Sequence, residues 1–416
     1  MAEQHEKALV PQIRFTGFTD PWEQRKLSDL VLIERGGSPR PIDAYITEDP
    51  AGLNWVKIGD APSMGRYITS TSEKIKPEGL SKTRQVYPGD LVLSNSMSFG
   101  RPYIMAIEGC IHDGWLLIRD TQNQFDPVFL CHMLGTPKML DQYRMFASGS
   151  TVNNLNKDLV GNATVPVPNR NEQVEIGKYL DELDSLITLH QRKYDKLCVL
   201  KKSMLDKMFP KGGSLYPEIR FAGFTDPWEQ RKLGEVARRV TRKNENGDSD
   251  LPLTISAQYG LVDQRTFFNS QVASKDMSGY FLLHRGEFAY NKSTSTDSPW
   301  GAIKRLEKYD MGCVSTLYIC FELLSEDPDF LVTYYETDRW YKAVQLIAAE
   351  GARNHGLLNI APDDFFETQI CIPKRIDEQR QIGAFFDRLD SLITLHQRKL
   401  KLLRNIKKSM LDKMFV

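Results

Sequence analysis

The sequence predicts two α/β (α+β) domains in tandem, separated by two long helices that form an antiparallel coiled coil, with the whole chain arranged as a pseudo-twofold internal repeat. Three observations predict this fold class. One segment is written twice, a second heptad-patterned segment repeats at the same offset, and the regions between the copies mix short β-rich runs with loops. The period is too long for a solenoid, whose repeats span roughly 20–50 residues.

The duplication is nearly letter-perfect. Residues 11–27 read PQIRFTGFTDPWEQRKL and residues 217–233 read PEIRFAGFTDPWEQRKL, identical at 15 of 17 positions. The same offset of 206 carries residues 180–209 onto residues 386–415, where 22 of 30 positions match. Within that pair, LDSLITLHQRK and KKSMLDKMF are perfect copies. We call the duplicated segments constant and the regions between them variable. Such a chain is a dimer made within one polypeptide.

Composition sets modest bounds. At 416 residues two or three domains are expected, and 41% hydrophobic with 26% charged residues argues against disorder. No apolar run approaches the ~18 residues of a membrane span, and the N-terminus lacks the apolar stretch of a signal peptide. The six cysteines form no CxxC pair, so we predict no metal site and expect free thiols in a reducing cytoplasm. The zero net charge argues against a protein that grips nucleic acid by bulk charge alone.

Two constant segments are predicted to be long helices. Each follows prolines and opens on a polar residue with an acid, which predicts an N-cap and an acidic first turn at Asn171, Glu172, Asp377 and Glu378. Apolar residues then recur with alternating spacings of four and three, as in a heptad. The predicted helix-pair seam consists of Ile176, Leu180, Leu183, Ile187, His190, Leu197, Ile382, Phe386, Leu389, Ile393, His396 and Leu403. The alternative is that each helix packs on its own domain, but two copies of one seam favour a helix pair.

Residues 172–209 and 378–415 predict helices of roughly 57 Å each, at ~1.5 Å per residue. If the pair is antiparallel about a pseudo-twofold axis, the midpoints meet, and His190 and His396 should lie close together. Pro210 and the following KGGSLYP end the first helix and mark a linker. The predicted division of the chain is an arm and constant head at 1–27, a variable domain at 28–165, a helix and linker at 166–216, a repeated head at 217–233, a second variable domain at 234–372 and a C-terminal helix at 373–416.

The variable domains are each about 140 residues long, a normal single-domain size. Strands are predicted at residues 91–93, 104–107, 115–118, 253–256, 288–290 and 316–321, and helical stretches at 127–146 and 328–349. A weak likeness links the two domains, because GDLVLSNS at 89–96 and GEFAYNKS at 286–293 both read as a turn, a strand and a polar exit. We interpret them as divergent versions of one α/β fold.

The duplicated WEQRKL head, the variable domain, the helix start from Pro168 to Glu172 and Gln173, and the repeat of this order resemble the specificity subunit of type I restriction-modification enzymes. The resemblance covers the chain from about Pro11. It implies that residues 28–165 and 234–372 are target recognition domains, each reading one half of an asymmetric bipartite target in double-stranded DNA. It also implies that the constant helices space these domains and dock two modification (methyltransferase) subunits, with up to two restriction (motor-nuclease) subunits.

The resemblance further implies that this chain is not catalytic. The assembled complex of that family is a DNA adenine methyltransferase and ATP-dependent endonuclease, so S-adenosylmethionine, ATP and magnesium are expected in the partner subunits and no cofactor in this chain. The sequence agrees, since it lacks an Asn/Asp-Pro-Pro-aromatic motif, a glycine-rich loop after a strand and a GxxxxGK[ST] phosphate loop. The scattered histidines lack metal-ligand spacing.

Basic and glycine-rich loops of the variable domains are candidates to contact DNA, because sequence-specific readers use Arg, Lys and Asn on base edges and polar groups on phosphates. Any one such loop is more often a solvated surface loop, so the hypothesis rests on the sets. In the first domain the candidates are Arg35, Arg40, Lys82, Arg84, Ser94, Asn95, Arg101 and Tyr103. In the second they are Arg239, Arg242, Asn291, Lys292, Ser293, Lys304, Arg305, Arg353 and Asn354.

Two other classes of function stay open at this point. One is a stand-alone bipartite DNA-binding regulator, which would bind its site tightly and purify without a methyltransferase. The other is a protein-binding scaffold, which would show no sequence preference on DNA. The duplicated head weighs against both, because it offers two equivalent docking surfaces to some partner.

Overall fold

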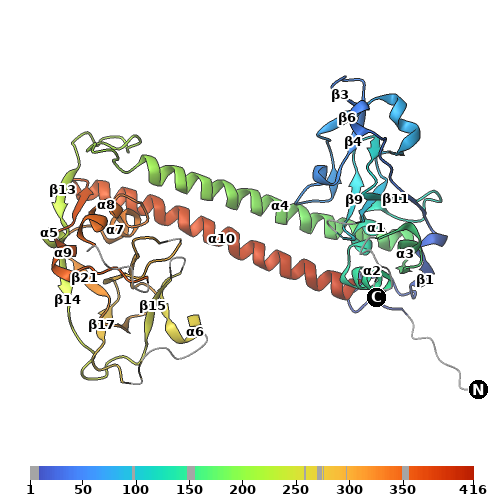
Figure 1. Cartoon of the computed structure of the whole chain (residues 1–416). Coiled ribbons are helices and arrows are strands. Elements are labelled where there is room, and N and C mark those ends of the chain that lie inside the picture. The colour runs from blue at the N-terminus through green and yellow to red at the C-terminus, as the bar shows by residue number, and fades with distance from the viewer. Residues whose placement is uncertain are drawn as a thin grey trace, which may run out of the picture. The chain divides into compact units, whose positions relative to one another are not determined.

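The computed structural model describes residues 9–95, 99–147, 155–256, 259–268, 274, 276–296, 298–348 and 356–416. The chain forms two compact units. Unit 1 comprises Met1–Lys193 and His396–Val416, and unit 2 comprises Tyr194–Leu395. The units cut across both long helices, so each unit holds one variable domain together with part of each helix (Figure 1).

Unit 1 contains two mixed sheets of five strands each. The first has the order β2 (Leu32–Arg35), β11 (Trp115–Arg119), β8 (Leu91–Ser94), β9 (Pro102–Met105) and β5 (Tyr67–Ile68). The second has the order β3 (Ile46–Thr47), β6 (Glu73–Ile75), β4 (Leu53–Val56), β10 (Gly109–Ile111) and β7 (Arg84–Val86). Short 3-10 turns connect them at η1 (Leu27–Asp29), η2 (Ile42–Ala44), η3 (Ile58–Asp60) and η4 (Pro77–Lys82).

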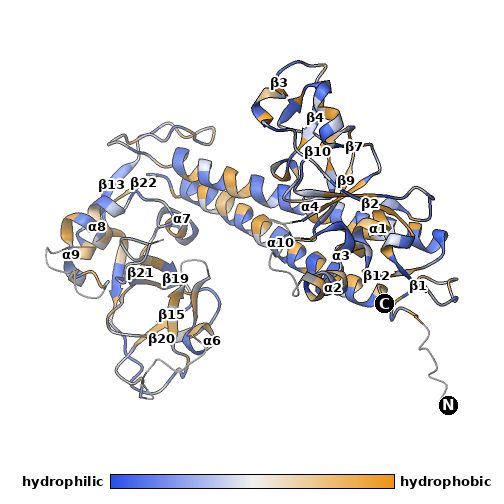
Figure 2. Cartoon of the chain, turned by 45° about the vertical axis from the view of Figure 1, so that its right-hand side comes forward, coloured by the Kyte–Doolittle hydropathy of each residue, from blue (hydrophilic) through white to orange (hydrophobic). Residues whose placement is uncertain are grey.

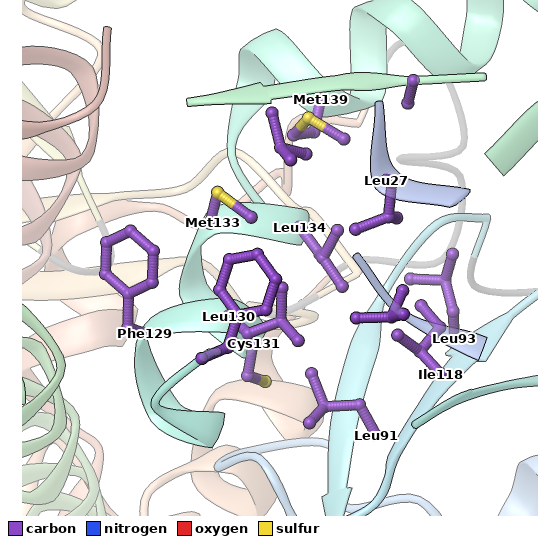
Figure 3. Packing of buried hydrophobic residues seen from close by; sticks show 14 of the residues in the cluster. Leu27, Leu91, Leu93, Ile118, Phe129, Leu130, Cys131, Met133, Leu134 and Met139 are labelled. Atoms are coloured by element: carbon purple, nitrogen blue, oxygen red, sulfur yellow. The ribbon is translucent and has the colours of Figure 1, made fainter. Parts of the chain in front are cut away.

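Three helices complete the variable domain of unit 1: α1 (Pro127–Leu134), α2 (Pro137–Ala147) and α3 (Lys157–Gly161). The single helical stretch predicted here is therefore two helices, because α1 ends at Gly135. Helix α1 begins where the Asp126 carboxylate accepts the backbone N–H of Phe129 and proline occupies the first turn. Figure 3 shows its apolar residues in the core with those of the first sheet, among them Leu130, Leu134, Leu91, Leu93 and Ile118.

Unit 2 repeats the first sheet in shorter form, with the order β14 (Ala237–Val240), β21 (Ile319–Leu323), β18 (Phe288–Asn291) and β19 (Ala302–Arg305). Two hairpin-like pairs accompany it, β15 (Leu253–Ser256) with β16 (Gly260–Asp263) and β17 (Phe281–His284) with β20 (Met311–Val314). Its short helices are α5 (Leu233–Val236), α6 (Gln264–Phe268), α7 (Pro328–Tyr334), α8 (Tyr341–Ile347) and α9 (Pro362–Phe366).

The predicted likeness of the two variable domains is confirmed by their sheets. Strand β8 lies between β11 and β9, and β18 lies between β21 and β19, all antiparallel. These are the strands of the GDLVLSNS and GEFAYNKS runs. Figure 2 shows hydrophobic residues on the central strands of each domain, and every residue of β8 is buried. A strand buried on both faces needs a near-continuous apolar run, which is why the sequence predicts β8.

A constant strand closes each variable domain. In unit 1, β1 (Glu23–Lys26) pairs antiparallel with β12 (Thr164–Val167), and in unit 2, β13 (Glu229–Lys232) pairs in the same way with β22 (Gln369–Ile372). Strands β1 and β13 are the EQRK of the two WEQRKL copies. The start and the end of each variable region are thereby hydrogen-bonded to each other. We call the constant heads, residues 11–27 and 217–233, together with the two long helices, the frame.

The two long helices are α4 (Arg170–Lys207) and α10 (Ile376–Met414). They confirm the predicted helices and shift their starts by two residues. The N-cap of α4 is Asn169, whose side chain accepts the N–H of Glu172 at 3.0 Å, so the N-cap predicted at Asn171 is wrong. Glu172 and Glu378 are fully buried instead of lying on an open first turn. Among the described residues, no helix is long and apolar enough to cross a membrane.

The helices run antiparallel within each unit. In unit 1 the first part of α4 lies beside the last part of α10, with Asp184 paired to Lys407 (Figure 1). In unit 2 the last part of α4 lies beside the first part of α10, with Lys201 Nζ 2.6 Å from Asp390 Oδ1. The predicted meeting of the midpoints is confirmed, since the Nδ1 atoms of His190 and His396 are 2.8 Å apart within unit 1.

The seam residues serve two contacts at once. Ile176, Leu180 and Leu183 belong to the core of unit 1 with the strands of the variable domain, and Ile382, Phe386 and Leu389 belong to the core of unit 2. Ile187 is also buried, Ile393 is half-buried, and Leu403 and Leu197 pack against the two cores from the opposite helix. The first half of each helix thus packs on its own domain and on the other helix, so both interpretations of the pattern hold.

The end of each helix enters the core of the unit in which it finishes. Phe415 stacks on Phe129 and lies edge-on to Trp22 in unit 1, and Phe209 does the same with Phe330 and Trp228 in unit 2. Both phenylalanines are buried. The last residue of the KKSMLDKMF copy thus completes the constant head of the opposite copy.

The histidine pair predicts a pH dependence of stability. Burial, followed by the like charges of neighbouring groups that include Lys193 and Lys399, lowers the pKa of His190 and of His396 below the usual 6.5. At 2.8 Å one ring donates and the other accepts, so charging both removes the acceptor. Because the folded pKa lies below the unfolded pKa, this contribution is complete above about pH 6.5 and is lost as the pH falls below it.

We expect the melting temperature of the chain to fall by a few °C between about pH 7 and pH 5.5 through this pair. The double variant His190→Gln, His396→Gln should lack this fall in melting temperature. At pH values where the two histidines do not titrate, its melting temperature should change with pH as that of the parent does. Calorimetry across this pH range measures it. A parent and a variant with superimposable pH profiles would contradict the expectation.

Candidate nucleic-acid interface and its frame

A buried carboxylate holds the start of each long helix. In unit 1 the Glu172 carboxylate accepts hydrogen bonds from Arg14 Nε at 2.6 Å, from Arg14 Nη2 at 2.8 Å and from Trp22 Nε1 at 3.2 Å. Glu172 has 0% exposure, so its charge depends on these donors. The hydrogen bond to Glu172 raises the pKa of the Arg14 guanidinium above its usual value.

Unit 2 repeats this arrangement 206 residues later. Arg220 Nε and Nη2 donate to Glu378 at 2.6 and 2.8 Å, and Trp228 Nε1 donates to Glu378 at 3.3 Å. The two sites differ by no more than about 0.1 Å in these three distances. The constant head is therefore duplicated because it binds the start of the helix that follows its own variable domain.

The glutamine that follows each buried glutamate binds the backbone of the variable domain through its side chain. Gln173 Oε1 accepts the N–H of Asp126, the N-cap of α1, at 2.9 Å. Gln379 Oε1 accepts the N–H of Asp327, the N-cap of α7, also at 2.9 Å. Because each glutamine contacts main chain, the frame can hold variable domains of different sequence as long as their first helix begins at this place.

Glycine one turn further on permits the close approach. A β-carbon on Gly177 would lie 2.7 Å from Asp126 Oδ1, and one on Gly383 would lie 2.8 Å from the backbone nitrogen of Phe330. Any larger residue would push the first helix of the variable domain away from α4 or α10. The repeated Glu, Gln and Gly of each helix start thus form one docking face for a variable domain.

Basic side chains of unit 1 gather around Asp113. Arg35 Nε donates to the Asp113 carbonyl at 3.3 Å, Arg40 Nη2 lies 3.5 Å from Asp113 Oδ2, and His112 Nε2 lies 3.0 Å from Asp113 Oδ1. The Arg40 side chain is 76% exposed. We call Arg35, Arg40, His112 and Asp113 the Asp113 cluster. It presents two guanidinium groups at one edge of the domain.

Two glycines allow this cluster to form. A β-carbon on Gly36 would collide with the His112 carbonyl, and one on Gly37 would lie 2.5 Å from the Lys82 carbonyl. The Arg35–Arg40 loop therefore lies directly on two neighbouring backbone segments. Lys82, whose Nζ donates to the Tyr45 hydroxyl at 2.7 Å, and Arg84, whose Nε donates to Glu34 at 3.2 Å, come from the same edge and are exposed. The structure thus brings four of the predicted residues together.

The remaining candidates of unit 1 lie elsewhere. Arg101 is exposed, donates to the Ser63 carbonyl at 3.1 Å and lies over the Tyr103 ring. Ser94, Asn95 and Tyr103 are buried, with exposures of 0%, 3% and 2%. Their assignment to a DNA-contacting surface is corrected: Tyr103 packs edge-on to Trp115, and the Asn95 amide donates to the Asp113 carbonyl, where it supports the loop of the Asp113 cluster.

In unit 2 the predicted residues fall into separate groups. Arg239 lies in β14, Arg242 follows its end, and both are exposed. Arg239 lies 3.7 Å from Asp363, and Arg242 lies 2.7 Å from Glu287. Asn291, Lys292 and Ser293 form the exit of β18. Lys292 Nζ donates to the Ile360 carbonyl at 3.2 Å, and burial lowers its pKa. Only Ser293 of this triplet is fully exposed.

Lys304 and Arg305 face the frame. Both line one hollow with Lys201 and Asp390 of the long helices, and Arg305 donates to Asp329 at 2.6 Å and to Glu307 at 2.8 Å. Their place against α10 makes them structural partners and removes them from an open DNA-contacting edge. The predicted Arg353 and Asn354 lie outside the described residues.

The described part of the chain offers no group of three or more His, Cys, Asp or Glu that could hold a metal ion. The cysteines are free. Burial raises the pKa of the Cys110 and Cys131 thiols to about 11 and that of Cys320 to about 12, which keeps these thiols protonated and unreactive.

Two sets of functional residues escaped the sequence reasoning. The contacts of Arg14, Trp22 and Glu172 were signalled only by the fixed offset of the repeat, which marked them as constant without saying what they touch. Arg66 was not signalled at all. It is 6% exposed and its guanidinium binds Asp181, at 3.2 Å, and Asp184 on α4. A single arginine in a loop gives no sequence pattern from which a buried ion pair can be read.

Comparisons with known proteins find relatives of the first variable domain and of the whole fold. Residues 19–198 match the family model of the type I restriction modification DNA specificity domain. Two Methanocaldococcus jannaschii proteins are similar: the MjaVIII specificity subunit of a type I restriction enzyme, 30% identical over 227 residues, and one named for the MjaX specificity subunit, 26% identical over 227 residues. The matched segments cover 52% of this chain in both cases, and 49% and 52% of the relatives. The chain spans about half the length of the curated relatives it matches.

Among solved structures, the type I restriction-modification S subunit from M. genitalium shares the fold. Its TM-score is 0.56 at 14% identity, and the match covers 98% of this chain and 99% of that one. The tandem arrangement of two mixed domains and two long helices is thus an established architecture. The chain thus resembles type I restriction-modification specificity subunits, in sequence over about half of its length and in fold over nearly all of it.

Proposed function

We propose that this chain is the DNA sequence-specificity subunit of a type I restriction-modification complex and has no catalytic role of its own. The observation that carries the proposal is that two different variable domains are each held by one copy of the same frame. Each domain then reads one half of an asymmetric bipartite target in double-stranded DNA, and the constant helices set the distance between the halves.

The DNA-contacting surface proposed for the first domain is the edge formed by the Asp113 cluster with Lys82 and Arg84. Exposed arginine and lysine side chains at one edge suit contacts to phosphates and to guanine edges. In the second domain the matching proposal is Arg239 and Arg242, with Ser293 at the exit of β18. These sets supply few charges, which fits a chain of zero net charge whose partners add further phosphate contacts.

The first test uses the target that is methylated only in cells that carry this chain with its modification subunit. We expect Arg35→Ala, Arg40→Ala to weaken binding of the assembled methyltransferase to that target. The slope of log affinity against log salt should fall by about 1 for each phosphate that the variant no longer neutralises. The matched control is Arg144→Ala, an exposed arginine on α2 whose side chain is 65% exposed. Binding that is equally strong in the double variant and the control would exclude this edge.

A second surface is repeated on the long helices. Leu186 and Leu189 are 43% and 46% exposed in unit 1, and Leu392 and Leu395 are each 44% exposed in unit 2. Spaced three residues apart, the two leucines of each pair share one helix face. Large apolar side chains that stay open in both letter-perfect copies indicate a protein interface. We assign this repeated leucine pair to the modification subunits, which would carry S-adenosylmethionine, while ATP and magnesium belong to the restriction subunits in the same cytoplasmic complex.

The repeat predicts two modification subunits per chain. One modification subunit should remain bound at saturation in the double variant Leu186→Ser, Leu189→Ser, and also in the double variant Leu392→Ser, Leu395→Ser. The quadruple variant should bind none. Native mass spectrometry of the purified complex counts them. Val199 and Leu402 are 69% and 59% exposed but have no apolar counterpart in the other copy, so serine there should leave two subunits bound. A single subunit on the parent chain at saturation would contradict the assignment.

A further inference from the structure

The two copies of the helix pair build the same polar site twice. In unit 1 Asp184 of α4 pairs with Lys407 of α10, and in unit 2 Asp390 of α10 pairs with Lys201 of α4. All four residues lie in the letter-perfect segments, and the offset of 206 exchanges the two pairs. We call each pair the constant Asp–Lys pair.

Each variable domain adds one charged side chain to this pair, and the two domains use opposite charges. In unit 1 Arg66 binds the aspartate end, with its guanidinium on Asp184 and on Asp181, its Nε 3.2 Å from Asp181 Oδ1. In unit 2 Glu336 binds the lysine end, with Oε2 2.7 Å from Lys201 Nζ. The frame is the same and the contact differs only in which end of the pair it uses.

Burial makes these contacts decisive for position. The side chains of Arg66, Lys201 and Glu336 are 7%, 17% and 24% exposed. Burial lowers the pKa of Lys407 to about 8, with the nearby Arg66 charge adding to the effect. Asp181 and Asp390 are 38% and 45% exposed, so the more buried groups are the ones that need an oppositely charged partner in a fixed geometry. If a variable domain shifts on the frame, its charged side chain separates from the constant Asp–Lys pair. A charge is then left in a poorly solvated place without a partner.

We propose that the constant Asp–Lys pair is the site that orients each variable domain on the frame, and that Arg66 and Glu336 are its positioning residues. Because the pair offers a carboxylate at one end and an ammonium at the other, it accepts a variable domain that presents either a cation or an anion. One invariant site can thereby fix the orientation of domains with unrelated sequences. The part of this inference that concerns DNA rests on the proposed function, while the docking contact does not.

The experiment uses the full chain in complex with its modification subunits and compares Arg66→Ala and Glu336→Ala with Arg66→Lys, Glu336→Asp and the exposed control Arg144→Ala. Sequencing of methylated sites should show both half-sites unchanged in the alanine variants, with methylation spreading to targets whose spacer is about one base pair longer or shorter. The lysine and aspartate variants should restore the single spacer, because each keeps its charge. A residue that merely stabilised the core would lower methylation at all sites alike, and an unchanged single spacer in both alanine variants overturns the proposal.

Hydrogen exchange on the same complexes decides the matter where an alanine variant loses methylation altogether. Exchange that rises about tenfold or more only in residues 64–68 and 181–187 of Arg66→Ala supports local undocking. Exchange that rises throughout unit 1 shows a general loss of stability and overturns the proposal. If the parent chain directs no methylation, the proposed function fails, and the exchange measurement still tests the docking contact by itself.

Discussion

The structure depends on one buried ion pair, made twice. Glu172 and Glu378 sit at the start of the long helices with almost no exposure, each clamped by an arginine and a tryptophan of the constant head that precedes its variable domain. Removing one partner of such a pair typically costs about 3–5 kcal/mol, because a charge is left buried without compensation. The ion pair links the constant head that precedes each variable domain to the long helix that follows it, so both chain ends of the domain are attached to the frame.

The ends of the helices add a second constraint. Each helix starts in the unit of its own variable domain and finishes in the core of the other unit, through Phe209 and Phe415. Neither unit is therefore made from one copy of the sequence repeat, and each needs both. Duplicated segments must then stay compatible across copies, which explains why the parts that match best are the helix centre and the helix end. The variable domains must keep apolar residues where the seam residues enter their cores, but their polar contacts with the frame are made through the main chain and one charged site.

The parts of the fold that were predictable from sequence are those with a period or a copy. The heptad spacing and the fixed offset led to two helices and to the meeting of His190 with His396. Apolar runs led to β8 and β18. Many strands of two to four residues were missed, because such short runs carry no alternation to detect.

The candidate residues for a DNA-contacting surface were predictable only as sets. Arg35, Arg40, Lys82 and Arg84 do meet at one edge, but Ser94, Asn95 and Tyr103 are in the core, because a polar exit from a strand looks the same whether it turns outward or folds beneath a loop. Lys304 and Arg305 were misplaced for a related reason: a basic pair in a loop does not show that five carboxylates of the same unit surround it. Tertiary contacts between distant segments decide these cases.

The central claim is that two independent readers are mounted on one repeated frame. The most direct measurement exchanges residues 28–165 and 234–372 within a single chain and sequences the DNA sites that the resulting methyltransferase modifies. If the frame is equivalent at both positions, the chain should still direct methylation to the same asymmetric target with an unchanged spacer, because exchanging two domains about a pseudo-twofold axis only moves each half-site to the other DNA strand. A chain that still directs methylation, but to half-sites found in neither parent position, would show that the frame takes part in reading DNA and would contradict the claim.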